Sequence, residues 1–261
     1  MRLLKPILEK KEVTLYLDVK DLTVLYDRAI VLNKVSFQVG LGEMVSLVGP
    51  NGAGKSTCLR AISGLIKWEK DALKGTVLGK ITLGGSVKFE DEELTHLYAH
   101  EIARRGMILC PERGRPFREM TVLENLKAGA LLNDKISGEQ HLEKCYRLFP
   151  VLEQRKSQVS GTLSGGERTM LSIARSLMSK PKLLLIDEPS VGLAPKVKED
   201  LFAKIRDVKE MGITILLVEQ DISYAFDLAV RNYVISRGKI VAQGKAEELL
   251  ADELLKNTYL A

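Results

Sequence analysis

The chain has 261 residues, of which 45% are hydrophobic, so it is long enough to bury the core of one large domain or two small ones. Its net charge of +5 comes from interspersed basic and acidic residues, and only 5% of the residues are aromatic, which argues against nucleic acid as a partner. No apolar run approaches the roughly 18 residues that a spanning helix needs, and residues 1–11 lack the pattern of a signal peptide. Three scattered cysteines without CxxC spacing indicate a reducing compartment.

Short β-prone segments fill the first forty residues. Residues 14–19, 23–26 and 35–39 read as strands, and a glycine-containing turn follows at 40–43. Tyr26 lies in a polar, turn-like setting at the end of the second strand. It could be an ordinary strand-end tyrosine, or, in a nucleotide-binding fold, it could stack on an adenine ring.

A glycine-rich loop lies between the apolar run 45–48 and a helix-competent segment at 58–66. It matches GxxxxGK[ST] without a mismatch and consists of Gly49, Pro50, Asn51, Gly52, Ala53, Gly54, Lys55, Ser56 and Thr57. A loop of this kind between a strand and a helix binds phosphate, because its backbone N–H groups and the helix dipole face the phosphate oxygens. Lys55 could then reach the β- and γ-phosphates, and the Ser56 hydroxyl could bind Mg²⁺.

The next region is less regular. Residues 67–85 contain four glycines around two β-prone pieces, which predicts an extra hairpin or an extended surface loop. Further strands are expected at 87–89 and 107–110, with a helix over 92–105 between them. The last strand runs into a charged loop that contains Glu112, whose side chain could reach a bound nucleotide.

A helical stretch over 121–149 begins with a capping box formed by Thr121 and Glu124. A second motif, LSGGE at 163–167, opens another helix, with Ser164 as its N-cap. Because glycine costs helix stability, the pair Gly165 and Gly166 predicts that something approaches this backbone closely.

The third motif is LLLIDEP, an apolar strand at 183–186 that ends in Asp187 and Glu188. The carboxyl edge of a parallel sheet is where ligands bind in open α/β folds. Since adjacent strand residues point opposite ways, we expect Asp187 to face the Mg²⁺ shell and Glu188 to face the water that attacks the γ-phosphate. A helix at 196–208, a strand at 213–218 and a hairpin turning at 237–238 complete the chain.

The three motifs GPNGAGKST, LSGGE and LLLIDEP, in this order, resemble the ATP-binding cassette (ABC) ATPases over nearly the whole chain. The resemblance implies one α/β domain with a RecA-like P-loop NTPase core and an antiparallel β piece (13–89 and 163–261), and a helical, signature-bearing subdomain at about 90–162. It implies that Tyr26 stacks on adenine and that Glu188 is the catalytic base. It also implies that Ser164, Gly165 and Gly166 close over the ATP of a partner chain.

Within the superfamily, residues 188–195, 217–220 and 244–261 look like the ATP-binding subunits of branched-chain amino-acid importers. Glu112 replaces the usual glutamine, Gln220 the switch histidine and Ala194 the D-loop aspartate, and all three are similar to what this subgroup carries. Gln220 cannot change charge near neutral pH, so it would only orient the γ-phosphate or the water. Glu112 could bind Mg²⁺ or sense the γ-phosphate.

The resemblance implies a cytoplasmic ATPase that binds ATP and Mg²⁺, pairs with an identical or different ABC ATPase subunit, and lies on the inner membrane face through permease subunits. A substrate-binding protein would deliver the solute, expected to be a branched-chain amino acid, with urea or short amides as alternatives. A lipid or lipopolysaccharide exporter shares the core but more often keeps the switch histidine and D-loop aspartate. Soluble ABC ATPases that act on DNA or ribosomes usually carry tandem cassettes or coiled-coil inserts, and this sequence has neither.

Overall fold

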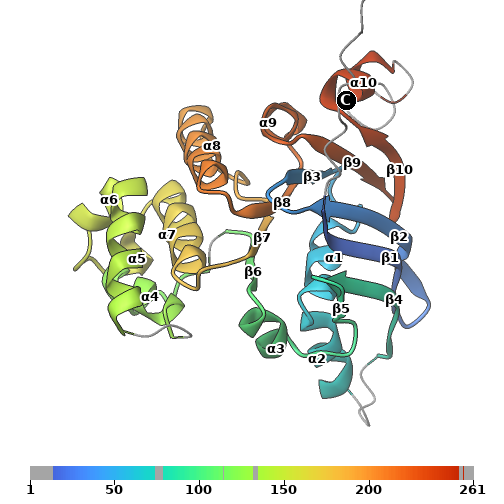
Figure 1. Cartoon of the computed structure of the whole chain (residues 1–261), viewed down its shortest axis with the longest axis horizontal. Coiled ribbons are helices and arrows are strands. Elements are labelled where there is room, and N and C mark those ends of the chain that lie inside the picture. The colour runs from blue at the N-terminus through green and yellow to red at the C-terminus, as the bar shows by residue number, and fades with distance from the viewer. Residues whose placement is uncertain (1–13, 74–78, 114, 132–134, 253–254, 256–261) are drawn as a thin grey trace, which may run out of the picture.

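The computed structural model describes residues 14–73, 79–113, 115–131, 135–252 and 255, which form two sheets flanked by helices (Figure 1). The strands are β1 (Leu15–Tyr26), β2 (Ala29–Gly40), β3 (Met44–Val48), β4 (Ile81–Phe89), β5 (Glu92–Glu93), β6 (Met107–Cys110), β7 (Leu183–Asp187), β8 (Thr214–Glu219), β9 (Arg231–Ser236) and β10 (Lys239–Gly244). The helices are α1 (Lys55–Ile62), α2 (Leu65–Ala72), α3 (Ala99–Arg104), α4 (Val122–Gly129), α5 (Lys135–Leu148), α6 (Pro150–Gln154), α7 (Gly165–Leu177), α8 (Pro195–Glu210), α9 (Ile222–Leu228) and α10 (Ala246–Ala251), with a 3₁₀ turn η1 at Ser160–Thr162.

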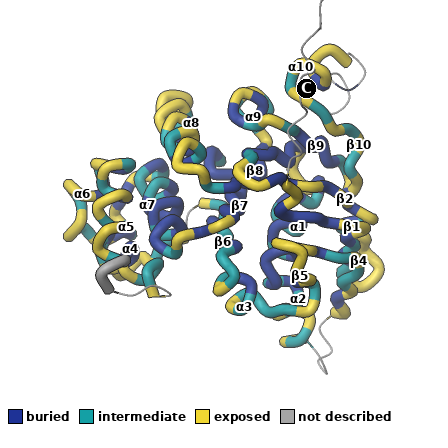
Figure 2. Tube along the Cα trace, in the orientation of Figure 1, coloured by how far each residue is buried: buried dark blue, intermediate teal, exposed yellow. Residues whose placement is uncertain are grey.

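The larger sheet has the strand order β10-β9-β3-β8-β7-β6 and is parallel except for β10. Every residue of β3, β7 and β8 is buried (Figure 2), as expected for parallel strands covered on both faces. Alternate residues of β7 belong to two hydrophobic cores. Leu185 lies in the same core as Leu59 of α1, and Leu184 lies in the same core as Leu171 of α7. The predicted α/β core is confirmed, and its sheet has helices on both faces.

The smaller sheet, ordered β2-β1-β4-β5, is antiparallel, so the predicted β piece near the start of the chain is confirmed. The two strands expected at 14–19 and 23–26 form one bulged strand, β1, whose register shifts between Val19 and Leu22. At the bulge Asp21 has φ 49°, and a Cβ on Gly85 of β4 would lie 2.6 Å from its carbonyl oxygen. The sequence pattern placed Gly85 in a hairpin or loop. In the structure it lies in a strand, where the bulge in β1 leaves no space for a side chain.

Two local predictions were wrong. The first part of 67–85 continues the helix α2, and the last part begins the long strand β4, so 67–85 forms no separate hairpin among its described residues; residues 74–78 lie outside them. The helix expected over 92–105 is only α3, at 99–104, because Glu92 and Glu93 pair with β4 as a short edge strand.

The helices α4, α5 and α6 form a lobe with α7 at one end of the molecule (Figure 1). The predicted capping box at its start is confirmed: the Thr121 hydroxyl accepts a hydrogen bond from Glu124 N at 3.2 Å, and Thr121 N donates to the Glu124 carboxylate. Strand β6 is the edge of the core sheet, so the lobe starts after Cys110 rather than at residue 90.

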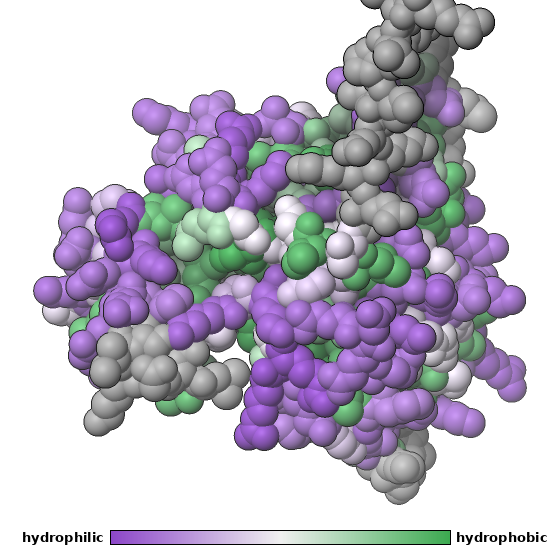
Figure 3. All heavy atoms as spheres, in the orientation of Figure 1, coloured by the Kyte–Doolittle hydropathy of each residue, from purple (hydrophilic) through white to green (hydrophobic). Residues whose placement is uncertain are grey.

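The carboxyl-terminal part forms the predicted helix α8 and the predicted β9–β10 hairpin, which turns at Arg237 (φ 46°) and Gly238 (φ 73°). Hydrophilic residues cover most of the face seen in Figure 3, with hydrophobic ones showing mainly in the recess near its centre. Among the described residues, no helix is both long enough and apolar enough to cross a bilayer.

Candidate functional site

The glycine-rich loop joins β3 to α1 and closes around its own lysine. Gly54 caps α1 with φ 105°, a left-handed conformation that strains residues with a Cβ. Lys55 is only 3% exposed, and its ammonium donates to the carbonyl oxygens of Gly49 at 2.7 Å and Pro50 at 3.0 Å. The same Nζ lies 3.0 Å from Glu188 Oε1, so a carboxylate balances this buried charge.

Asp187 and Glu188 both face the glycine-rich loop, so the expectation that they point opposite ways was wrong. Strand β7 ends at Asp187, whose Oδ1 accepts a hydrogen bond from Ser56 Oγ at 3.0 Å. Glu188 then adopts φ 41°, and this left-handed backbone turns its side chain to Lys55. A strained residue of this kind is a frequent feature of functional sites.

The carboxylates at this edge are crowded and poorly hydrated. Burial, together with the charges of Glu188 and Glu112, raises the pKa of Asp187 to about 6, although the Ser56 hydrogen bond and Lys55 oppose the rise. Glu112 follows β6, the neighbouring strand, and pairs with Arg113 at 3.1 Å. The resulting set of hydroxyl and carboxylate oxygens suits a hard divalent cation such as Mg²⁺, whose charge would relieve the repulsion among the carboxylates.

Tyr26 lies at the end of β1, partly buried against the core. Its hydroxyl donates to Glu69 Oε2 of α2 at 3.5 Å, and Glu69 is also ion-paired with Arg60 of α1. The structure thus connects Tyr26 to α2. This helix contains the first part of segment 67–85, to which no function was assigned from the sequence.

The outer face of the glycine-rich loop borders an open cavity of about 730 Å³. The opposite wall is the β9–β10 hairpin, which supplies the cations Arg237 and Lys239, and Gly238 N donates to Ala53 O at 2.9 Å. Sequence reasoning missed this contact because nothing near residue 237 indicates which loop the hairpin meets.

The LSGGE motif begins α7, and its serine caps the helix as predicted. Ser164 Oγ accepts from Glu167 N at 3.3 Å, and Ser164 N donates to Glu167 Oε2 at 2.8 Å, while Ser164 itself is exposed. A Cβ on the buried Gly166 would lie 2.3 Å from Val197 Cγ1 of α8. The group that approaches this backbone closely within the chain is therefore the side chain of Val197.

The glycine-rich loop and the LSGGE motif lie in different parts of the molecule. The helix α1 packs into the core on one face of the larger sheet, whereas α7 packs into the core on the other face. The first turn of α7, with its exposed N-cap Ser164, is part of the helical lobe (Figure 1). The two motifs are thus not joined into one pocket by the contacts of the described residues.

The switch region follows β8. Gln220 is exposed, but its neighbour Glu219 is fully buried and accepts hydrogen bonds from the backbone nitrogens of Ser190 (3.1 Å), Gln220 (2.9 Å) and Asp221 (3.2 Å). Burial is the main cause that raises the Glu219 pKa. Glu219 therefore holds the loop after Glu188 next to the switch loop, and the two border one cavity of about 440 Å³. No role was assigned to Glu219 from the sequence. A carboxylate at the end of an apolar strand is, however, the same signal that identified Asp187 as a site residue.

Known proteins resemble this chain in sequence and in fold. The ABC transporter family profile matches residues 32–191. The chain is 40% identical to the high-affinity branched-chain amino acid transport ATP-binding protein BraG of Pseudomonas aeruginosa, over 90% of this chain and 95% of BraG. It is 32% identical to the lipopolysaccharide export system ATP-binding protein LptB of Escherichia coli, over 94% and 96%.

Among solved structures, a nucleotide-free ATP-binding cassette from an ABC transporter superposes with a TM-score of 0.76 and 27% sequence identity, covering 93% of this chain and 97% of that one. The glycine-rich loop, the strand-end carboxylates and the LSGGE helix are set on the same fold. The chain therefore belongs to the ABC transporter family, as one of its ATP-hydrolysing subunits.

Proposed function

We propose that this subunit powers the import of branched-chain amino acids, or closely related small polar solutes, through partner permeases. The 40% identity to BraG over nearly the whole of both chains supports this assignment. The substitutions Glu112, Gln220 and Ala194 fit the same subgroup. The 32% identity to LptB makes lipopolysaccharide export the second candidate.

The contact between Lys55 and Glu188 carries the proposed mechanism. Glu188 Oε1 lies 3.0 Å from the Lys55 ammonium, which would hold the γ-phosphate. When ATP binds, its γ-phosphate would replace Glu188 as the partner of Lys55. The released Glu188 carboxylate would then lie next to the phosphorus that water attacks. Glu188 would orient that water and accept its proton.

The Mg²⁺ that accompanies ATP would be held by Ser56 and Asp187, with Glu112 as a further oxygen ligand. The hydrogen bond between Ser56 and Asp187 supports this, since both oxygens already point at one place. Held there by Ser56 and Asp187, the ion would supply positive charge that offsets the negative charge of the phosphates. Its binding requires an ionised Asp187, whose pKa of about 6 leaves most molecules ionised at neutral pH.

A second ABC ATPase subunit would complete the site. The first-turn amides of α7 at Ser164, Gly165 and Gly166 are the group we assign to the γ-phosphate of the partner chain's ATP, because a helix N-terminus attracts anions. Tyr26 would stack on the adenine, and Gln220 would orient the γ-phosphate or the attacking water. Through its permeases the dimer would lie at the cytoplasmic face of the membrane, and a binding protein would supply the solute.

Uptake by cells tests this assignment. Cells that lack the chain should lose uptake of radiolabelled leucine, regain it with the wild-type chain, and not regain it with Glu188→Gln. Urea and a short amide serve as competing solutes, and outer-membrane lipopolysaccharide serves as the export readout. Unchanged leucine uptake in the deletion, together with defective lipopolysaccharide export, would overturn the import assignment in favour of the second candidate.

A further inference from the structure

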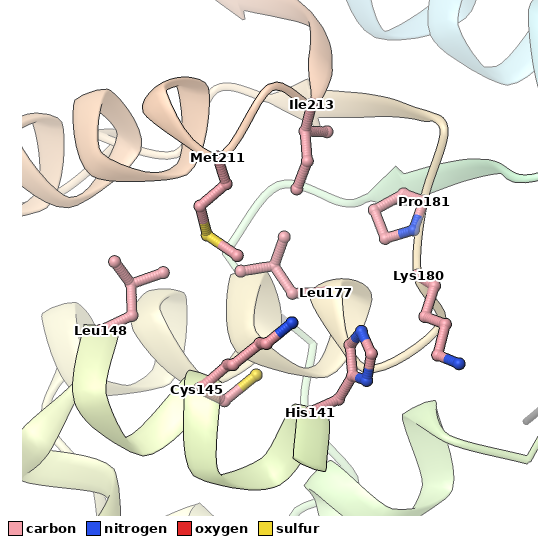
Figure 4. Close-up of a pocket in the computed structure, with 9 residues that line it drawn as sticks. His141, Cys145, Leu148, Leu177, Lys180, Pro181, Met211 and Ile213 are labelled. Atoms are coloured by element: carbon pink, nitrogen blue, oxygen red, sulfur yellow. The ribbon is translucent and has the colours of Figure 1, made fainter. Parts of the chain in front are cut away.

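A cavity of about 230 Å³ lies between the helical lobe and the core, away from the nucleotide site. Helix α5 and the end of α7 form one wall (Figure 4), and Met211 and Ile213, which precede β8, form the opposite wall. Pro181 lies just before β7. The cavity is therefore at the amino ends of β7 and β8, whereas the phosphate-binding residues lie at the carboxyl ends.

The floor of the cavity is apolar. In Figure 4 the side chains of Leu148, Leu177, Met211 and Ile213 converge on one space. Cys145 adds a thiol, and burial raises its pKa to about 12, so the thiol stays neutral. Met211 is 50% exposed, an unusual position for a large apolar side chain that faces a hollow.

The rim of the cavity is basic. Lys144 and Lys180 are both exposed, and His141 also lines the cavity. Among the nine lining residues, all of which the structure describes, none is acidic. A ligand that fits this pattern carries an aliphatic part and a negative charge. It carries no ammonium group, because no carboxylate is there to pair with one.

We propose that this cavity binds an aliphatic monocarboxylate of about four to eight carbons. The chain of the ligand would cover Met211 and Leu177, and its carboxylate would lie at the rim beside Lys144 and Lys180. An amino acid is a poorer fit than the same carbon skeleton without its amino group. Such a ligand would bridge α5 of the lobe and the end of α8 in the core, and it would not compete with ATP for residues.

A chain-length series on the full chain tests the proposal. Isothermal titration with butanoate, hexanoate and octanoate should give one site per chain, with affinity rising about fourfold for each added methylene until the cavity is full, the usual effect of burying a CH₂ group. Hexan-1-ol and hexylamine, which have the same chain but lack the carboxylate, should bind at least about tenfold more weakly if a charge-assisted contact holds the acid. The acids should bind equally well in the presence of ATP.

Two variants at exposed positions locate the site without disturbing the core. Met211→Glu places a negative charge at the mouth and should weaken hexanoate binding at least about tenfold, and the double variant Lys144→Glu, Lys180→Glu should do the same. The matched controls are Val230→Glu, at a similarly exposed apolar residue elsewhere, and Lys127→Glu on α4. The proposal is wrong if no saturable binding occurs at millimolar acid, if the amine binds as well as the acid, or if the controls reduce binding as much as the cavity variants.

Discussion

The glycine-rich loop and the LSGGE motif, to which we assign phosphate binding, are built on different principles. Around the glycine-rich loop polar groups are paired with one another: the buried Lys55 with Glu188, and the partly buried Ser56 with the buried Asp187. At the LSGGE motif Ser164 is exposed, and its partner is a residue of its own helix turn, Glu167. In the proposed mechanism the glycine-rich loop would exchange these internal partners for its ligand, whereas the LSGGE motif would present the start of a helix to a nucleotide bound by another chain.

This difference separates two kinds of mutational effect. Changes at the buried carboxylates alter both the stability of the nucleotide-free chain and its chemistry, because each residue balances a buried charge or hydrogen bond. Changes at Ser164 should hardly alter the ATP affinity of a single chain but should lower the rate of hydrolysis. Four substitutions, from the largest expected effect to the smallest, test this difference.

Glu188→Gln should have the largest effect. Glutamine keeps the shape of the side chain but cannot accept the proton of the attacking water, so hydrolysis should fall roughly 10²- to 10⁴-fold. ATP binding should persist, because Lys55 keeps its contacts with Gly49 and Pro50 and loses only a competing carboxylate. Single-turnover hydrolysis and ATP titration measure the two effects, and an unimpaired rate would remove Glu188 from its assigned role.

Ser164→Arg should lower hydrolysis about 10²- to 10³-fold, because the long side chain would keep the phosphate away from the first-turn amides, and losing a stabilising donor at a developing charge usually costs that much. Binding of ATP by the single chain should change less than about twofold, because Ser164 lies apart from the glycine-rich loop. Thr121→Arg is a matched control, since it removes an equivalent capping box on α4. If Thr121→Arg reduces hydrolysis as much as Ser164→Arg does, the effect is only the loss of a cap, which costs about 1 kcal/mol.

Asp187→Asn should make the nucleotide-free chain more stable near neutral pH. The pKa of Asp187 is about 6 in the folded chain against a usual 3.8, so the folded chain holds a proton that the unfolded chain has lost, and stability falls as pH rises from about 4 to 6. The variant should gain up to about 3 kcal/mol at pH 7 and nothing near pH 4. Urea unfolding without metal measures the gain, and a gain that is constant with pH would contradict the raised pKa.

Gly166→Ala should destabilise the chain by about 1–3 kcal/mol, the usual cost of overpacking. The new Cβ would lie 2.3 Å from Val197 Cγ1, and the added substitution Val197→Ala should restore most of the loss. Gly165→Ala, whose Cβ would meet Leu193 at 3.3 Å, should cost less. Equal costs at the two glycines, or no rescue by Val197→Ala, would show that packing against α8 is not the reason for Gly166.

Local signals in the sequence predicted the motifs, the buried strands and the helix caps. The buried strands β3, β7 and β8 stand out because parallel strands are covered on both faces. The misread segments depend on contacts between distant residues: Gly85 serves a bulge in β1, and Glu92 joins a strand rather than a helix because β4 lies beside it. The direction of Glu188 could not be predicted, since its left-handed backbone overrides the alternation of a strand.

In the proposed mechanism, one complete ATP site needs the glycine-rich loop of one chain and the LSGGE helix of another. Mixing Lys55→Ala chains with Ser164→Arg chains tests it most directly. In a mixed dimer both lesions fall in one site and the other site is intact, so the mixture should hydrolyse ATP although each variant alone is inactive. With random pairing and independent sites, about a quarter of the wild-type rate is expected. A mixture that forms dimers but recovers no activity would contradict the claim.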